Sequence, residues 1–326
     1  MHTYGNIFRI HIWGSSHTPE MGVLIDGVPP GMEIFADDFT EALNRRRTGV
    51  KGSSPRKEAD VPAIRAGVYQ GRTTGGPLHI VFENQNQKPG EYTEREFPRP
   101  GHADMAAKQK YKGFNDPRGG GFFSGRMTVL LVAAGVVARK IVNNIQFQSE
   151  VISVGGQSSW QAVLDEVIAS GDSLGAEVKT RIEGLEPGLG EPFFNSIESE
   201  ISRLIFSIPG AKAIAFGDGF AADKMKGSEF NDAIMDKSGK TASNHNGGIT
   251  GGISNGMPVE FSVKFKPTPS IQKTQQSWKP APDRVEAVQV KGRHDVCYAL
   301  RAPVILESVA AIALVDLMMQ KKGREL

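Results

Sequence analysis

Residues 99–126 read RPGHADMAAKQKYKGFNDPRGGGFFSGR, and the rest of the chain can be arranged around this stretch. It holds His102 in a Pro-Gly turn, a basic helix-like segment, three glycines at 119–121, and Arg126 at the start of an apolar helix predicted over 127–141. Glycine lets the backbone adopt a positive φ and approach a ligand closely. The N–H groups of the following helix point back at these glycines, so the stretch predicts an anion site to which Arg126 adds a charge-assisted contact. A glycine turn without a ligand is the competing interpretation.

Composition and charge are those of an ordinary globular protein. The 326 residues carry 38 Lys and Arg against 36 Asp and Glu, and this net charge of +2 does not by itself indicate a polyanionic partner. Cys297 is the single cysteine, so no intramolecular disulfide can form and a reducing compartment is expected. The chain opens without an apolar signal sequence, and the run that we expect to come closest to a membrane span, 127–138, stops at Arg139. We therefore expect a cytoplasmic enzyme that binds neither membrane nor nucleic acid.

The first half predicts two strands joined by a histidine loop, followed by a helix that ends in cations. Alternating apolar residues indicate strands at 7–13 and 21–26, which places His17 in the loop between them. Asp37 or Asp38 can cap a helix that runs to Arg47. Because the three arginines at 45–47 point in different directions, we expect at least one to face inward, where a small polyanionic substrate would use it.

Two other interpretations of these cations stay open. They can complement the negative end of the helix, or they can form a nucleic-acid surface together with the basic residues up to Lys57. A nucleic-acid surface would need a larger positive charge interleaved with aromatic residues, and the sequence has neither. Further strands are predicted at 61–69 and 77–82, and the polar loop at 83–90 has no role that the sequence reveals.

The second half predicts strands at 151–155, 176–183 and 211–216, and helices at 160–169, 195–206 and 304–318. The polar, glycine-rich segment 227–256 is typical of a functional or mobile loop. Lys266, Thr268 and Ser270 follow a strand and carry donors that suit a phosphate or a flavin edge, with a plain proline turn as the alternative. Asp295 follows Arg293 and His294, which would keep it ionised and able to accept a proton, with a solvated charged turn as the alternative.

The second half also repeats features of the first. The turn 26–31 (DGVPPG) resembles 183–188 (EGLEPG), and in each case a strand precedes the turn and an amphipathic helix follows. The strand at 76–82 resembles 257–263, and a long apolar helix comes late in each half. We therefore expect an α+β fold in which a helical layer is sandwiched between two antiparallel β-sheets. The expected halves, about 1–150 and 151–326, would form a pseudo-twofold repeat within a single domain over 1–326.

Eight motifs, in this order and spacing, resemble the chorismate synthase family over nearly the whole chain. They are GSSHTPEMGVLIDGVPPG (14–31), RRRTG (45–49), RPGHAD (99–104), RGGGFFSGRMT (118–128), GSEFND (227–232), GGISNGMP (251–258), KPTPS (266–270) and GRHD (292–295). The resemblance implies the anti-1,4-elimination of phosphate from 5-enolpyruvylshikimate 3-phosphate to give chorismate. It also implies the helical layer between two sheets and a homotetramer.

The same resemblance implies reduced FMN (FMNH2) as cofactor, although the reaction has no net redox change. NADPH would then act only indirectly, as the source of flavin reduction. The chain shows no added flavin-reductase domain, so an external flavin reductase is the expected partner.

The family's functional residues carry over position by position. His17 matches the histidine that protonates departing phosphate, His102 the one beside the flavin pyrimidine, and Asp295 the carboxylate that acts at flavin N5. The matched substrate arginines are Arg46, Arg99, Arg126 and Arg293, the last also on the cofactor side. The matched flavin-contacting residues are Phe122, Phe123, Ser124, Gly251, Lys266, Pro267, Thr268, Pro269 and Ser270.

Departures from the family pattern leave an alternative open. The family has a carboxylate where Ser15 stands and a glycine where Thr18 stands, and Phe122 and Phe123 replace a cation and a hydroxyl. The usual arginine a few residues past Arg47 has no clear counterpart, and the chain is short for the family. A paralogue that still binds flavin or anions but has weakened activity is therefore the second hypothesis. No metal site is expected.

Overall fold

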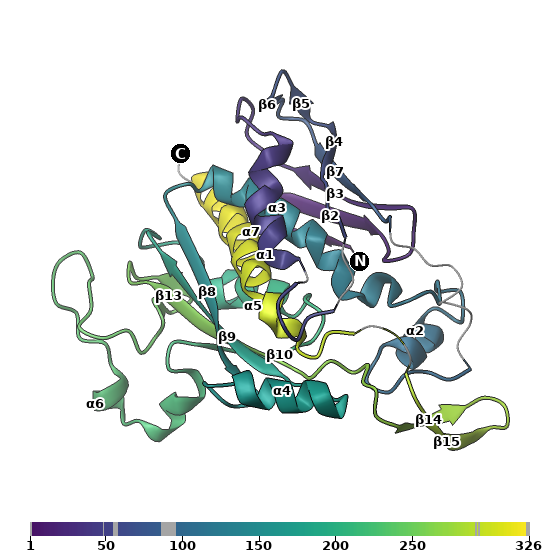
Figure 1. Cartoon of the computed structure of the whole chain (residues 1–326). Coiled ribbons are helices and arrows are strands. Elements are labelled where there is room, and N and C mark those ends of the chain that lie inside the picture. Colours follow the sequence, from purple (N-terminus) through teal and green to yellow (C-terminus); the bar gives the residue numbers. More distant parts are fainter. Residues whose placement is uncertain are drawn as a thin grey trace.

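The first sheet is antiparallel and occupies the upper right of Figure 1. The computed structural model describes residues 2–47, 49–54, 58–85, 96–290, 292 and 294–323. Within them the strand order is β1-β2-β3-β7-β4, with bounds Thr3–Tyr4, Arg9–Gly14, Glu20–Asp26, Leu78–Glu83 and Ala63–Ala66. Gly14 pairs with Met21, and Glu20 pairs with Glu83. The end of β2, the start of β3 and the end of β7 therefore meet at one edge, where the His17 loop lies.

The second sheet is also antiparallel, with the order β10-β13-β9-β8. Its strands span Ala211–Phe216, Val259–Phe265, Ala176–Glu183 and Gln146–Val154. Numbered along the chain, β2, β3, β4 and β7 of the first sheet pair in the order first, second, fourth, third. The strands β8, β9, β10 and β13 pair in the same order.

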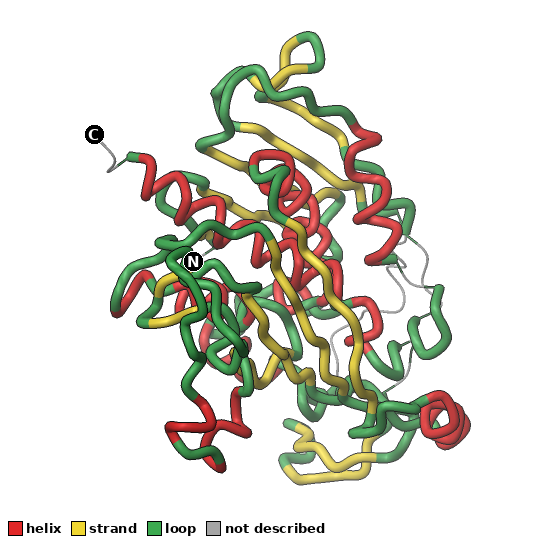
Figure 2. Tube along the Cα trace, turned by 90° about the vertical axis from the view of Figure 1, so that its left-hand side faces the viewer, coloured by secondary structure: helices red, strands yellow, loops and turns green. Residues whose placement is uncertain are grey.

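Helices fill the space between the two sheets (Figures 1 and 2). They are α1 (Thr40–Arg46), α3 (Thr128–Ile141), α5 (Ile197–Ile205) and α7 (Pro303–Lys322). Every residue of α7 from Val304 to Leu317 is buried. This helix packs closely on α3 because Gly135 has no side chain there: a Cβ on Gly135 would lie 2.3 Å from the Cβ of Ser308. The apolar core is one continuous cluster that draws residues from both sheets and from these helices.

Smaller elements surround this core. The helix α2 (Asp104–Lys110) lies beside the hairpin of β14 (Gln275–Lys279) and β15 (Arg284–Val288), at the lower right of Figure 1. The short helix α6 (Gly227–Phe230) projects at the lower left. The remaining elements are α4 (Gln161–Ser170), β5 (Val68–Tyr69), β6 (Arg72–Thr73), β11 (Ile249–Thr250) and β12 (Ile253–Ser254).

Most elements expected from the sequence are present, and the differences have local causes. The strand predicted at 151–155 is longer and begins at Gln146, because polar residues on both of its faces hide the alternation there. The hairpin of β14 and β15 was not predicted, since its strands are polar and largely exposed. Segment 227–256 contains α6, β11 and β12 rather than loop alone.

The expectation about the most apolar segment was wrong. Pro303–Lys322, rather than 127–138, comes closest to a membrane span, because it is long and apolar enough to cross a bilayer. However, 78% of its apolar window is buried inside the protein. Burial among other helices and against β8 and β9 is the normal environment of a core helix.

Candidate functional site

Two arginines share one buried carboxylate at the start of α3. Arg46 Nη1 lies 3.0 Å from Asp60 Oδ2, and Arg126 Nη1 pairs with Asp60 Oδ1. Arg46 also donates to the carbonyls of Gly125 and Arg126 and to Thr128 Oγ1. Burial lowers the pKa of Arg46 to about 10, an effect that Asp60 opposes and Arg301 reinforces. The guanidinium is therefore still charged at neutral pH.

Asp60 holds this position with its backbone in the left-handed region, at φ 46°. Such a conformation is uncommon for residues other than glycine and persists only where the surroundings enforce it. Here the enforcing contacts are the two guanidinium groups. Arg126 Nη2 is buried and makes no hydrogen bond within the described part of the chain, so this donor lacks an acceptor there.

The loop between β2 and β3 is held rigidly around His17. Ser16 Oγ lies 2.8 Å from His17 Nδ1. Thr18 Oγ1 accepts a hydrogen bond from the Ser15 N–H at 2.8 Å and lies within donating distance of the Ser15 and Glu20 carbonyls. The loop therefore keeps a tight turn with a threonine where the related family has glycine, and Thr18 needs no positive φ. Ser15 stands where the family pattern has a carboxylate, and here Ser16 provides the hydrogen-bonding partner of the His17 imidazole.

The glycine triplet meets this loop. A Cβ on Gly119 would lie 2.0 Å from His17 Cε1, so only glycine lets the imidazole lie where it does. The Ser16 N–H also points at the Gly121 carbonyl, at 3.4 Å. At the start of α3, Ser124 Oγ accepts the Arg126 N–H at 3.2 Å. The sequence predicted an anion at the N-terminal N–H groups of α3. One N–H group at this terminus is instead hydrogen-bonded by the protein itself.

Asn84 joins the two groups. Its Oδ1 accepts from Arg126 Nε at 3.2 Å, and its Nδ2 donates to the carbonyls of Ser15 and Thr18 at 3.1 and 2.8 Å. The buried cluster thus runs without interruption from the His17 loop to the arginine pair.

The turn around His102 joins the first half of the chain to the second. His102 Nε2 lies 2.6 Å from Ser270 Oγ, and Lys266 Nζ donates to the Gly101 carbonyl at 2.7 Å. Burial, reinforced by Lys212, lowers the pKa of Lys266. Thr268 Oγ1 is buried and unpaired within the described ranges. Of the donors predicted at 266–270, Ser270 therefore contacts His102 itself and Lys266 contacts the preceding residue.

Arg99 connects this turn to the glycine triplet. Its guanidinium forms a two-pronged pair with Asp104, at 2.7 and 2.8 Å, and donates to the Gly119 carbonyl at 2.9 Å. Asp104 already balances the charge of Arg99. Arg99 therefore positions the glycine triplet rather than offering a free cation to a ligand. Because Gly119 also contacts His17, Arg99 and Gly119 together connect the His102 turn to the His17 loop.

Asp295 lies just before α7. It accepts from the Ser54 N–H at 2.7 Å and from Arg301 Nη2 at 2.8 Å. Arg301 in turn lies over the ring of Tyr298, 5.0 Å from its centroid. Gly125 approaches the same ring, since a Cβ there would lie 2.9 Å from Tyr298 Cε2. Asp295 is thereby joined to the arginine pair through Tyr298 and Arg301.

Not every predicted residue joins this cluster. Gly251 lies in the turn between β11 and β12, and its neighbour Gly252 packs against Glu191 and Ser196. This turn is at the Lys321 end of α7, whereas Asp295 is at the other end of that 20-residue helix. The two positions are separated by roughly 30 Å of helix. Phe122 and Phe123 are each 45% exposed, and Phe122 lies 5.1 Å from the ring of His2. Arg293 lies outside the described residues.

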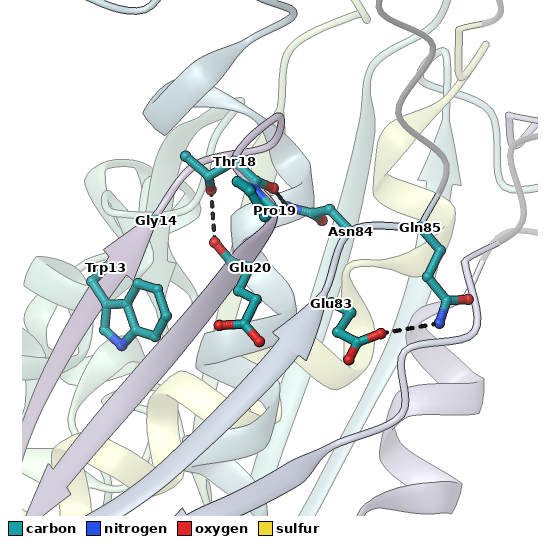
Figure 3. A pocket seen from close by; sticks show the side chains of 8 residues that line it. All are labelled: Trp13, Gly14, Thr18, Pro19, Glu20, Glu83, Asn84 and Gln85. Carbon is teal, nitrogen blue, oxygen red and sulfur yellow. Dashed lines mark hydrogen bonds between the residues drawn. The ribbon is translucent and has the colours of Figure 1, made fainter.

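A cavity of about 720 Å³ opens beside the His17 loop (Figure 3). Its lining residues are Trp13, Gly14, Thr18, Pro19, Glu20, Glu83, Asn84 and Gln85. Two of these are glutamates on adjacent strands, so the cavity does not suit a polyanion. The buried arginine–histidine cluster behind Thr18 and Asn84 is the better candidate site.

The described residues contain no group of three His, Cys, Asp or Glu side chains arranged to hold a metal ion. The site chemistry visible there consists of guanidinium, imidazole and carboxylate groups. Fold and site together define an α+β enzyme whose charged cluster suits a small anionic substrate.

Comparison with known proteins identifies the family. The model of the chorismate synthase family matches residues 8–319. A chorismate synthase from Chitinophaga pinensis is 52% identical, covering 98% of this chain and 97% of its own. One from Aeropyrum pernix is 38% identical, covering 98% and 93%. A crystal structure of chorismate synthase superposes with a TM-score of 0.76 at 23% identity, over 98% of this chain and 94% of its own. The chain belongs to the chorismate synthase family.

Proposed function

We propose that the protein converts 5-enolpyruvylshikimate 3-phosphate to chorismate by anti-1,4-elimination of phosphate. The observation that carries this proposal is the convergence of His17, Arg126 and Arg46 in one buried cluster. Membership of the family adds the substrate and the carbon–oxygen lyase reaction. No observation favours the paralogue with weakened activity, since the departures at Ser15 and Thr18 leave the His17 loop well hydrogen-bonded.

The surroundings of His102 fit reduced FMN. Lys266, Thr268 and Ser270 offer donors there, and the buried Thr268 Oγ1, which has no partner among the described residues, is consistent with a polar group of the cofactor at this position. Phe122 and Phe123 present exposed aromatic surface that can stack on a planar ring. When bound, reduced FMN supplies the electron density that assists phosphate departure. NADPH enters only as the source of the reduced flavin.

The protein's own residues bind, orient and move protons. Arg126 presents Nη2, which has no partner among the described residues, to an anionic group of the substrate, and Arg46 adds positive charge beside it. His17 donates a proton to the departing phosphate, and Ser16 at Nδ1 fixes the orientation of the ring. Asp295 is held by Arg301 and the Ser54 N–H as an acceptor. His102 and Ser270 hold the cofactor side.

The finer organisation is part of the same proposal. The shared strand order of the two sheets supports a pseudo-twofold repeat of halves that enclose a common helical layer. Exposed aromatic side chains such as Phe193 and Phe194, 85% and 89% exposed, support self-association into a homotetramer. An external flavin reductase and a cytoplasmic location complete the proposal. Light scattering of the purified protein would measure the oligomeric state.

Phosphate release tests the function directly. Purified protein, photoreduced FMN and 5-enolpyruvylshikimate 3-phosphate are mixed without oxygen, and phosphate and chorismate are followed together. We expect equimolar release of both, dependent on reduced FMN. Release no faster than in protein-free buffer would contradict the proposal.

Removal of the acid–base groups tests the site. We expect His17→Ala, His102→Ala and Asp295→Ala each to slow turnover by about a hundredfold or more, the usual scale for such groups. His11→Ala is the matched control, because His11 is an exposed imidazole whose side chain hydrogen-bonds only Thr3 within the described part of the chain. Normal turnover in any of the three variants would remove that residue from the mechanism.

A further inference from the structure

Asn84 is the first residue after β7, and it contacts the His17 loop three times. Its backbone N–H donates to the Pro19 carbonyl at 2.9 Å, and its Nδ2 donates to the carbonyls of Ser15 and Thr18. Figure 3 shows the side chain directed at the loop from the neighbouring strand end. The two side-chain bonds fall on either side of His17 in sequence. They therefore fix both ends of the short segment that carries the imidazole.

The other end of the same amide holds Arg126. Arg126 Nε can only donate, and the two loop carbonyls can only accept, so the orientation of the Asn84 amide is determined by chemistry. Asn84 is 7% exposed, which makes each of these bonds costly to lose. Arg126 is held from its other side by Asp60, which also pairs with Arg46.

We propose that Asn84 is a positioning residue that locks the His17 loop to the guanidinium of Arg126, so that the proton donor and the anion-binding cation keep one fixed geometry. The proposal rests on the proposed function, in which Arg126 binds an anionic group of the substrate and His17 protonates the departing phosphate. No other residue type of this size offers an acceptor to Arg126 and two donors to the loop.

Asn84→Asp tests the contact with the His17 loop separately from the contact with Arg126. Aspartate keeps an acceptor for Arg126 but loses both N–H donors and places a carboxylate against two carbonyls. We expect kcat to fall by about a hundredfold, the scale of a small misplacement of a catalytic group, while KM changes by less than about threefold. Gln85→Ala is the matched control on the next residue, whose side chain hydrogen-bonds only Glu83 within the described ranges, at 3.4 Å. Its kcat should equal that of the wild type.

Two measurements do not depend on turnover. The C2–H resonance of His17, followed by NMR against pH in apoprotein, should titrate at a different midpoint in Asn84→Asp and at an unchanged one in Gln85→Ala. Amide hydrogen exchange of residues 15–18 should be about tenfold faster in Asn84→Asp. If wild-type protein releases no phosphate, the proposed function fails, but these two measurements still decide the role of Asn84.

Wild-type kcat, His17 titration and loop exchange in a folded Asn84→Asp would overturn the proposal. If that variant does not fold, Asn84→Ser replaces it, since it retains the backbone bond to Pro19 and shortens the side chain. The same loss of kcat with unchanged KM is then expected. Wild-type kcat and exchange in Asn84→Ser would be equally decisive against it.

Discussion

At the scale of single residues, Gly119 limits what the site can hold. Its φ is 57°, a conformation that side chains disfavour, and the His17 ring occupies the space where a Cβ would lie. Backbone strain and steric exclusion therefore act at one position. Gly113 separates the two effects, because its φ is 81° and a Cβ there would meet nothing within 4 Å.

Gly119→Ala should therefore harm activity far more than Gly113→Ala. Both variants carry the cost of alanine in the left-handed region, about 1 kcal/mol. Only Gly119→Ala also displaces the imidazole, and we expect it to slow turnover by about a hundredfold. Steady-state phosphate release, with thermal unfolding as the stability control, measures the difference. Equal activity in the two variants would show that the His17 position does not matter.

The residue scale also shows how this chain accommodates its departures from the family pattern. Thr18 uses its hydroxyl to hold the turn where a glycine is usual, and Ser16 contacts His17 Nδ1. Neither contact follows from the identity of the residue alone. A threonine at this position could equally have pushed the loop open.

At the scale of elements, the segment 227–256 is ordered around one carboxylate. Asp232 accepts hydrogen bonds from Ser243 Oγ, from the N–H of His245, and from both the backbone and the side chain of Asn246. Partial burial works against ionisation, but these hydrogen bonds outweigh it and lower the pKa of Asp232 from 3.8 to about 2. The charged form is therefore the one that the folded segment stabilises.

This shift gives the segment a predictable acid dependence. A carboxyl whose folded pKa is lowered contributes stability that is complete above its unfolded value and is lost as the pH falls toward the folded value. For Asp232 the window runs from about pH 4 down to about pH 2. The segment should therefore loosen across that window.

Hydrogen exchange of peptides from 227–256 in wild type and Asp232→Asn checks this expectation. The ratio of the two rates cancels the intrinsic pH dependence of exchange. We expect Asp232→Asn to exchange about tenfold faster at pH 5, on the scale of a hydrogen bond to a charged group, and the ratio to approach one near pH 2. Asp223→Asn, an exposed carboxylate just before the segment, is the control. A ratio that stays constant with pH would contradict the role of the carboxylate.

At the scale of the whole molecule, Glu307 ties the two halves together. This buried residue of α7 forms a two-pronged pair with Arg45 of α1, at 2.6 and 2.7 Å, and contacts Arg139 of α3 at 3.3 Å. It also accepts the N–H of Ser149 in β8, at 3.0 Å. Asp316, nine residues further along α7, accepts three backbone N–H groups from residues 6–8. Because these contacts join elements that are far apart in the sequence, we propose that the chain unfolds as a single cooperative unit.

Glu307→Ala should lower the free energy of unfolding by about 3 kcal/mol, because it leaves cations and an N–H group without their partner. Glu41→Gln, an exposed change on α1, should stay within about 0.5 kcal/mol of the wild type. Urea unfolding followed by far-UV circular dichroism and by tryptophan fluorescence measures both. Coincident transitions are expected, since the core spans both halves. Two separated transitions would contradict the single unit.

The sequence by itself determined the elements and the residue types of the site. Periodicity is local, so β9 at Ala176–Glu183 and the apolar helices α3 and α7 could be predicted from neighbouring residues. Inward placement of one of three consecutive arginines was confirmed at Arg46, which is 3% exposed. The histidines and arginines were identified because their motifs carry recognisable chemistry.

Only the tertiary structure decided which groups meet. Asp60 and Asn84 were not singled out, since an isolated Asp before a strand and an Asn in a polar loop carry no local signal. Their importance comes from partners 14 to 69 positions away: Arg46, Arg126 and Ser15. Gly251 was grouped with the site by its motif, yet the fold places it at the far end of α7. Pairing of this kind depends on sheet register and helix packing, which no local pattern encodes.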